Sequence, residues 1–93
     1  MNNGVLNLNS NVIVDFYADW CGPCKMVSQV INDTKIENAT VHKLNVDIDT
    51  ETPMIHSVRS IPTLIFFKGG AEVHRHVGVI RQLDFEKLIK NFY

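Results

Sequence analysis

Two cysteines separated by two residues are the most reactive groups in this sequence. They lie in the run Trp20-Cys21-Gly22-Pro23-Cys24-Lys25. At this spacing one thiolate can attack a disulfide, and the second cysteine can then displace the product. The chain has 93 residues and only 2 cysteines, which is too sparse for a structural disulfide framework. The alternative is half of a zinc site, but His74 and His76 form no second standard ligand pair. The pair therefore indicates redox chemistry.

A helix that begins beside Cys21 would activate its sulfur. Pro23 suits the first turn of a helix, and residues 23–35 place apolar side chains at helical spacing, namely Met26, Val27, Val30 and Ile31. Free backbone N–H groups and the helix dipole at this end favour a thiolate. Cys24 lies one turn later and would face the same sulfur.

The remaining elements form a sheet with helices on its faces. Apolar, β-branched runs predict strands at 12–17, 40–46 and 63–68, and Gly69-Gly70 predicts a hairpin into 71–77. Further helices are expected at 51–58 and from Gln82 onward. This order predicts an α/β fold with a mixed sheet. Residues 1–11 are expected to be irregular or to add an edge strand.

Composition favours one globular domain, spanning residues 1–93. Hydrophobic residues make up 45% and charged residues 20%, and the net charge is −1. The charges are scattered, so neither nucleic acid nor a strongly charged partner is indicated. The sequence shows no signal-like start and no membrane span. We therefore expect a cytoplasmic monomer that binds no metal.

Four stretches resemble the thioredoxin family, namely 14–26, 43–47, 58–64 and 76–78. The resemblance implies a thioredoxin fold with four or five strands and about three helices, in which the usual N-terminal strand and helix are truncated. It also implies a protein-disulfide reductase without a bound cofactor, recharged by a thioredoxin reductase that uses NADPH. Cys21 would attack and Cys24 would resolve. The Gly-Pro dipeptide between the cysteines resembles that of reductants. Thioredoxin itself, the reference case for the motif, has a reduction potential of about −270 mV, whereas the disulfide oxidant with the same fold has about −120 mV.

Two charged residues near the pair are candidates for proton transfer. Asp15 interrupts an apolar strand, so its pKa should be raised if the side chain is buried. By resemblance Asp15 moves the proton of Cys24, and Lys43 tunes Asp15. The alternatives are a carboxylate in water at a strand edge and an ordinary surface lysine.

A shallow apolar patch is expected to bind the substrate. By resemblance Pro62 is a cis-proline opposite the cysteines, and the backbone of Ile61 pairs with an extended client chain. The expected rim residues are Trp20, Gly22, Pro23, Ile61, Pro62, Val77 and Gly78.

The sequence departs from the family pattern in two places. Gln29 stands where family members usually have proline, so we expect a straighter helix. The missing N-terminal elements leave the 40–46 strand as a sheet edge. Two other functions fit the sequence: a thioredoxin-fold binding subunit and a glutaredoxin-like enzyme that uses glutathione.

Overall fold

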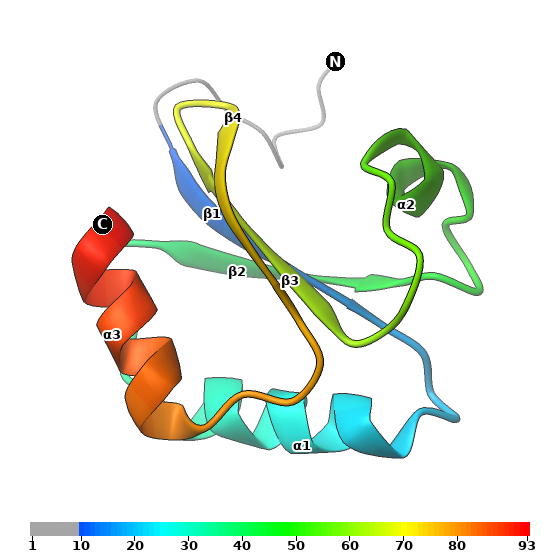
Figure 1. Cartoon of the computed structure of the whole chain (residues 1–93), viewed down its shortest axis with the longest axis horizontal. Helices are drawn as coiled ribbons and strands as arrows, with labels where there is room; N and C mark the ends of the chain where they lie inside the picture. Colours follow the sequence, from blue (N-terminus) through cyan, green and yellow to red (C-terminus); the bar gives the residue numbers. More distant parts are fainter. Residues whose placement is uncertain (1–9) are drawn as a thin grey trace.

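The computed structural model of the chain describes residues 10–93, in which strands alternate with helices except at one β-hairpin (Figure 1). The elements are β1 Asn11–Tyr17, α1 Gly22–Asp33, β2 Thr40–Asn45, α2 Glu51–Ile55, β3 Thr63–Lys68, β4 Ala71–Val77 and α3 Gln82–Phe92. Their order and type match the sequence-based prediction. The predicted edge strand or irregular segment falls mostly on residues 1–9, outside the described residues.

The four strands form one mixed sheet in the order β2-β1-β3-β4. β1 runs parallel to β2 and antiparallel to β3, and β3 pairs with β4 as a hairpin. In this register Asp15 of β1 lies beside Lys43 of β2 and Leu64 of β3. The prediction of a mixed sheet with β2 at one edge holds for the described part of the chain.

Each face of the sheet has its own apolar cluster, because side chains alternate along the strands. Ile13, Leu64 and Phe66 pack against α1 and α3 on one face, and these two helices also contact each other. Val14, Phe16 and Ile65 lie in the cluster on the other face. Asp15 has the same parity as Ile13 and therefore points toward α1.

The ends of two helices differ from the prediction. α1 stops at Asp33 because Thr34 has extended backbone and its hydroxyl donates to the Val30 carbonyl at 2.6 Å. α2 stops at Ile55 rather than at residue 58, since Ser57 takes a positive φ of 56°. None of the helices in residues 10–93 has the length and apolar character needed to cross a membrane.

Met26, one of the four apolar residues at helical spacing in α1, is exposed rather than packed against the sheet. Val27 and Ile31 are buried in the core, and Val30 packs against it, but Met26 is 57% exposed. α1 covers the sheet with one side only, and Met26 faces away from it. The apolar stripe is therefore narrower than the sequence pattern suggested.

Candidate redox site

The two cysteines lie where β1 passes into α1. Cys21 is the N-cap of α1, and its Sγ accepts a hydrogen bond from the Cys24 backbone N–H at 3.2 Å. The Cys21 N–H donates to the Ala18 carbonyl at 3.2 Å, which closes the turn after β1. The helix thus begins at the pair and directs free N–H groups toward the first sulfur. This arrangement favours negative charge on that sulfur.

Cys21 and Cys24 are joined in a disulfide, with their Cα atoms 5.3 Å apart. Both residues are buried, with exposed fractions of 4% and 3%. They form a small cluster with Ala18, against which Tyr17 and Ile61 pack. Another protein can therefore reach the sulfurs only by lying close against the surrounding surface.

A loop that precedes β3, at the same end of the sheet as the cysteines, borders the pair. The Ile61–Pro62 peptide bond is cis, and Pro62 accepts a hydrogen bond from the Gly78 N–H at 2.9 Å. Position 78 favours glycine because its φ is +98°, a conformation that residues with a side chain rarely adopt. Val77 beside it is 57% exposed. The structure thus brings together the predicted rim residues of the 61–62 and 77–78 segments.

Trp20 lies at the surface and lines the same groove as Ile61. Its indole ring is 72% exposed, and its Nε1–H donates to Asp47 Oδ2 at 2.8 Å. Sequence reasoning assigned Asp47 no role, although the residue ends one of the four family-like stretches. Twenty-seven positions separate Trp20 from Asp47, so only the folded chain reveals the contact.

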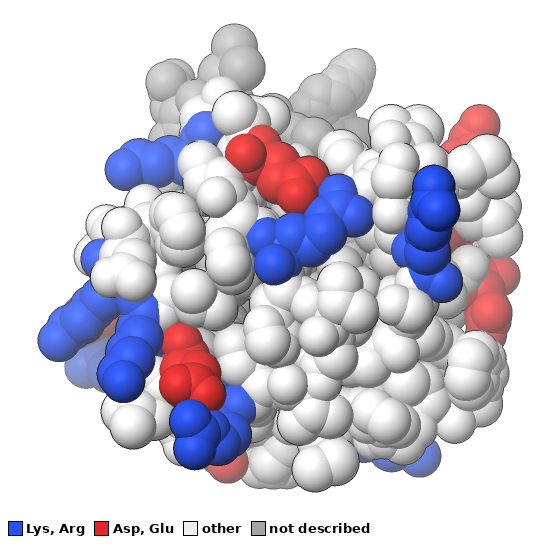
Figure 2. Space-filling model, viewed as in Figure 1, with Lys and Arg blue, Asp and Glu red and all other residues white. Residues whose placement is uncertain are grey.

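A groove of about 390 Å³ runs beside Trp20 and Ile61. Its lining is largely apolar and consists of Trp20, Val46, Pro53, Val58, Arg59, Ser60 and Ile61. Gly22 adds open space at the cysteines, since a Cβ placed there meets nothing within 4 Å. Figure 2 shows a broad area without charged side chains toward the N-terminal end of α1. The site therefore offers a largely apolar surface to a partner, and Arg59 is the charged residue of the groove lining.

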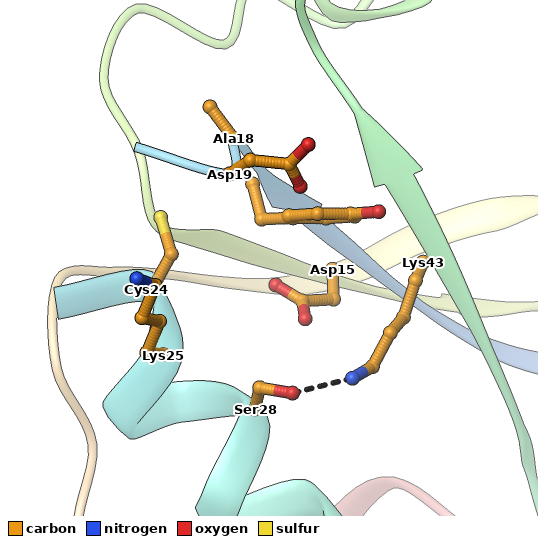
Figure 3. A pocket seen from close by; sticks show the side chains of 8 residues that line it. Asp15, Ala18, Asp19, Cys24, Lys25, Ser28 and Lys43 are labelled. Carbon is orange, nitrogen blue, oxygen red and sulfur yellow. Dashed lines mark hydrogen bonds between the residues drawn. The ribbon is translucent and has the colours of Figure 1, made fainter. Parts of the chain in front are cut away.

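Asp15 is buried behind the cysteines rather than exposed at a strand edge. Its side chain is 1% exposed, and this burial raises its pKa from 3.8 to about 6, partly opposed by the charge of Lys43. Oδ1 has no hydrogen-bond partner among the described residues. The carboxyl borders a pocket of about 150 Å³ that Cys24 also lines (Figure 3). Such a group suits proton exchange near neutral pH.

Lys43 reaches the same pocket from β2. It lies beside Asp15 in the sheet register, and its Nζ donates a hydrogen bond to Ser28 Oγ on α1 (Figure 3). The lysine therefore lies beside the buried carboxyl in the sheet, at the position that the family resemblance implied; its effect on the chemistry stays a prediction. Sequence reasoning missed Ser28, because nothing in the spacing of the two residues indicates this contact.

Metal ligation finds no support in the described residues. Across positions 10–93, no three His, Cys, Asp or Glu side chains gather as a metal-binding group. The group available for redox chemistry is the Cys21–Cys24 disulfide itself.

Comparison with known proteins agrees with this geometry. The family model described as Thioredoxin matches residues 1–91. The chain belongs to the thioredoxin family. It is 53% identical over 77 residues to thioredoxin from Mycobacterium tuberculosis, covering 80% of this chain and 66% of that relative. It is 49% identical over 77 residues to a bifunctional thioredoxin reductase/thioredoxin from Mycobacterium leprae, covering 80% of this chain and 17% of that protein.

A solved thioredoxin has the same fold. A mutant thioredoxin from Halobacterium salinarum superposes with a TM-score of 0.86 at 36% identity, over 95% of this chain and 79% of that one. The thioredoxin fold predicted from the sequence is thereby confirmed. The chain spans slightly less than two thirds of the length of the mycobacterial thioredoxin.

Proposed function

We propose that the chain reduces protein disulfides by dithiol exchange. The observation that carries this proposal is the position of Cys21 at the N-cap of α1, with the Cys24 N–H directed at its sulfur. A sulfur in this position is a better thiolate and leaving group than an ordinary cysteine. Membership of the thioredoxin family supports the same chemistry.

The first step begins from the reduced pair. The Cys21 thiolate attacks one sulfur of a client disulfide, so that a Cys21–client bond forms and the client's own S–S bond breaks. The displaced client sulfur leaves as a thiolate and takes a proton from water. The client now remains attached to Cys21 as a mixed disulfide.

The second step uses Cys24 and Asp15. The Cys24 thiol gives its proton to the Asp15 carboxylate, and its sulfur attacks Cys21 to form the internal disulfide. The bond between Cys21 and the client breaks, and the second client thiolate leaves. The pocket that Asp15 and Cys24 share supports this transfer, either directly or through one water molecule. The raised pKa of Asp15, about 6, lets it accept and return a proton near neutral pH.

A client would bind across the apolar surface that surrounds the pair. Ile61 lies just before β3, outside the sheet pairing, so its backbone is placed to pair with an extended client strand. The groove beside Trp20 and Ile61 would take the side chains next to the client cysteine. Trp20 is held for this contact by Asp47.

Recharging requires an external electron donor, because each turnover leaves the pair oxidised. We propose that a thioredoxin reductase supplies the two electrons from NADPH. The M. leprae relative, whose name combines a thioredoxin reductase with a thioredoxin, supports this partner. A reducing compartment such as the cytoplasm fits the role, because such compartments keep clients as thiols.

Reduction of insulin disulfides, driven by NADPH and thioredoxin reductases, tests the proposal. We expect NADPH oxidation and insulin precipitation with the natural chain, and neither with Cys21→Ser. Turnover with glutathione but with no thioredoxin reductase would instead favour a glutaredoxin-like enzyme.

A further inference from the structure

Ser28 joins two parts of the pocket that the proposed chemistry uses. It lies on α1 one turn after Cys24 and lines the same pocket as Asp15 and Cys24. Its Oγ accepts the hydrogen bond from Lys43 Nζ, which crosses from β2 to α1. Figure 3 shows the lysine side chain extending past Asp15 to reach this hydroxyl.

Lys43 needs such a partner if its ammonium group is to stay close to Asp15. The residue is exposed, on the strand β2 that forms one edge of the sheet in residues 10–93. A free lysine side chain has many rotamers that direct its ammonium into water. Within residues 10–93 no ion pair includes Lys43. The charge of Lys43 therefore acts on Asp15 through space, and its average distance depends on what holds the ammonium.

We propose that Ser28 is a positioning residue for the exchange reaction proposed above: its hydroxyl holds the Lys43 ammonium at the mouth of the pocket and so sets how readily Asp15 takes the proton of Cys24. The inference rests on the proposed function. Without the hydroxyl, the ammonium moves into water rather than onto Asp15, because desolvating it against a buried carboxyl is unfavourable.

Few other charged groups face Asp15. Asp19 precedes α1, Lys25 lies on α1, and both line the rim of the pocket and are exposed to water. Tyr17 and Cys24 complete the titratable groups of the lining, and the partner on β3 is the apolar Leu64. In the oxidised protein Cys24 does not titrate, so the titration of Asp15 is observed without a coupled thiol.

The test is a carbon-13 NMR titration of the Asp15 carboxyl in the oxidised protein. Four proteins are compared: the natural chain, Ser28→Ala, Lys43→Met and the double variant. We expect Ser28→Ala to raise the titration midpoint by about half a pH unit. Lys43→Met should raise it further, because the whole charge is removed. In the Lys43→Met background, Ser28→Ala should cause no further change.

Two more variants separate positioning from a general effect of replacing a helical residue. Ser28→Thr keeps a hydroxyl and should restore the natural midpoint. Gln29→Ala changes the next residue of α1, which bonds to Asp33 instead, and should leave the midpoint unchanged. An unchanged or lowered midpoint in Ser28→Ala, or the same rise in the Lys43→Met background, would overturn the inference.

A kinetic readout connects the titration to the reaction. In single turnover with a model disulfide, the pH profile of the resolving step should move with the Asp15 midpoint in Ser28→Ala. If the midpoint moves and this profile does not, the positioning role is wrong. Insulin reduction by the natural chain reports separately on the proposed function, because the titration requires no activity.

Discussion

Replacing Asp15 by asparagine should make the stability of the protein depend less on pH. The carboxyl is buried, and its pKa is raised from 3.8 to about 6 in the folded chain. Asparagine has nearly the same shape but carries no charge. Any loss of packing or hydrogen bonding in the variant is independent of pH, so the change with pH isolates the ionisation of Asp15.

The sign follows from proton binding. Between the two pKa values the folded protein holds more protons than the unfolded chain, so the free energy of unfolding falls as the pH rises. The stabilisation that protonated Asp15 contributes is complete below pH 3.8, declines from there to about pH 6, and is absent above that pH. A pKa change from 3.8 to about 6 corresponds to about 3 kcal/mol. From pH 3 to pH 8, the free energy of unfolding of Asp15→Asn should therefore rise by about 3 kcal/mol relative to that of the natural chain.

Urea denaturation of both oxidised proteins from pH 3 to pH 8 measures this difference. The oxidised form is required because its cysteines do not titrate. Asp19→Asn is the matched control: it removes an exposed carboxylate at the same pocket and should follow the natural chain within about 0.5 kcal/mol. Parallel curves for Asp15→Asn and the natural chain would refute the conclusion that burial of Asp15 is unfavourable to its charged form.

Further substitutions test the site and its supports. Tyr93→Phe removes the hydroxyl that lies 3.0 and 2.9 Å from carbonyls of β1 and β3, and should lower the free energy of unfolding by about 1 kcal/mol in urea denaturation. Gly78→Ala should lower it by about 1–2 kcal/mol because of its φ of +98°. Gly22→Ala meets no atoms within 4 Å, so it should keep its stability while raising the KM for insulin; an unchanged KM would argue against close approach of a client there. Asp47→Ala removes the hydrogen bond that holds the exposed Trp20 indole and should reduce kcat/KM about fivefold. An unchanged value would show that Asp47 does not position Trp20 for the client.

The elements of the fold were predictable because their patterns are local. β3 is a continuous apolar run whose residues are buried from Thr63 to Phe67, and the glycines at 69–70 supply the positive φ values of the hairpin. Pro23 indicated the start of α1. The errors occurred where tertiary packing decides. Met26 fits the helical period, yet the sheet covers only one side of α1 and leaves this side chain exposed.

The candidate site was predictable only where its residues stand in recognisable stretches. Cys21, Cys24 and Asp15 carry chemistry that their types and neighbours indicate. The contacts of Asp47 with Trp20 and of Ser28 with Lys43 join residues 27 and 15 positions apart. Nothing in their spacing specifies which strand register or helix face will bring them together. Such contacts emerge from the packing of α1 and β2 against β1.

Trapping of a mixed disulfide tests the central claim most directly. A Cys24→Ser variant should attack a client disulfide through Cys21 and then stop, because no second thiol can release the client. Intact-mass measurement should find the client bound to Cys21 in this variant, and no adduct on Cys24 in the matched Cys21→Ser variant. A stable adduct on Cys24 in Cys21→Ser, or no adduct in Cys24→Ser, would contradict the assignment of Cys21 as attacking and Cys24 as resolving cysteine.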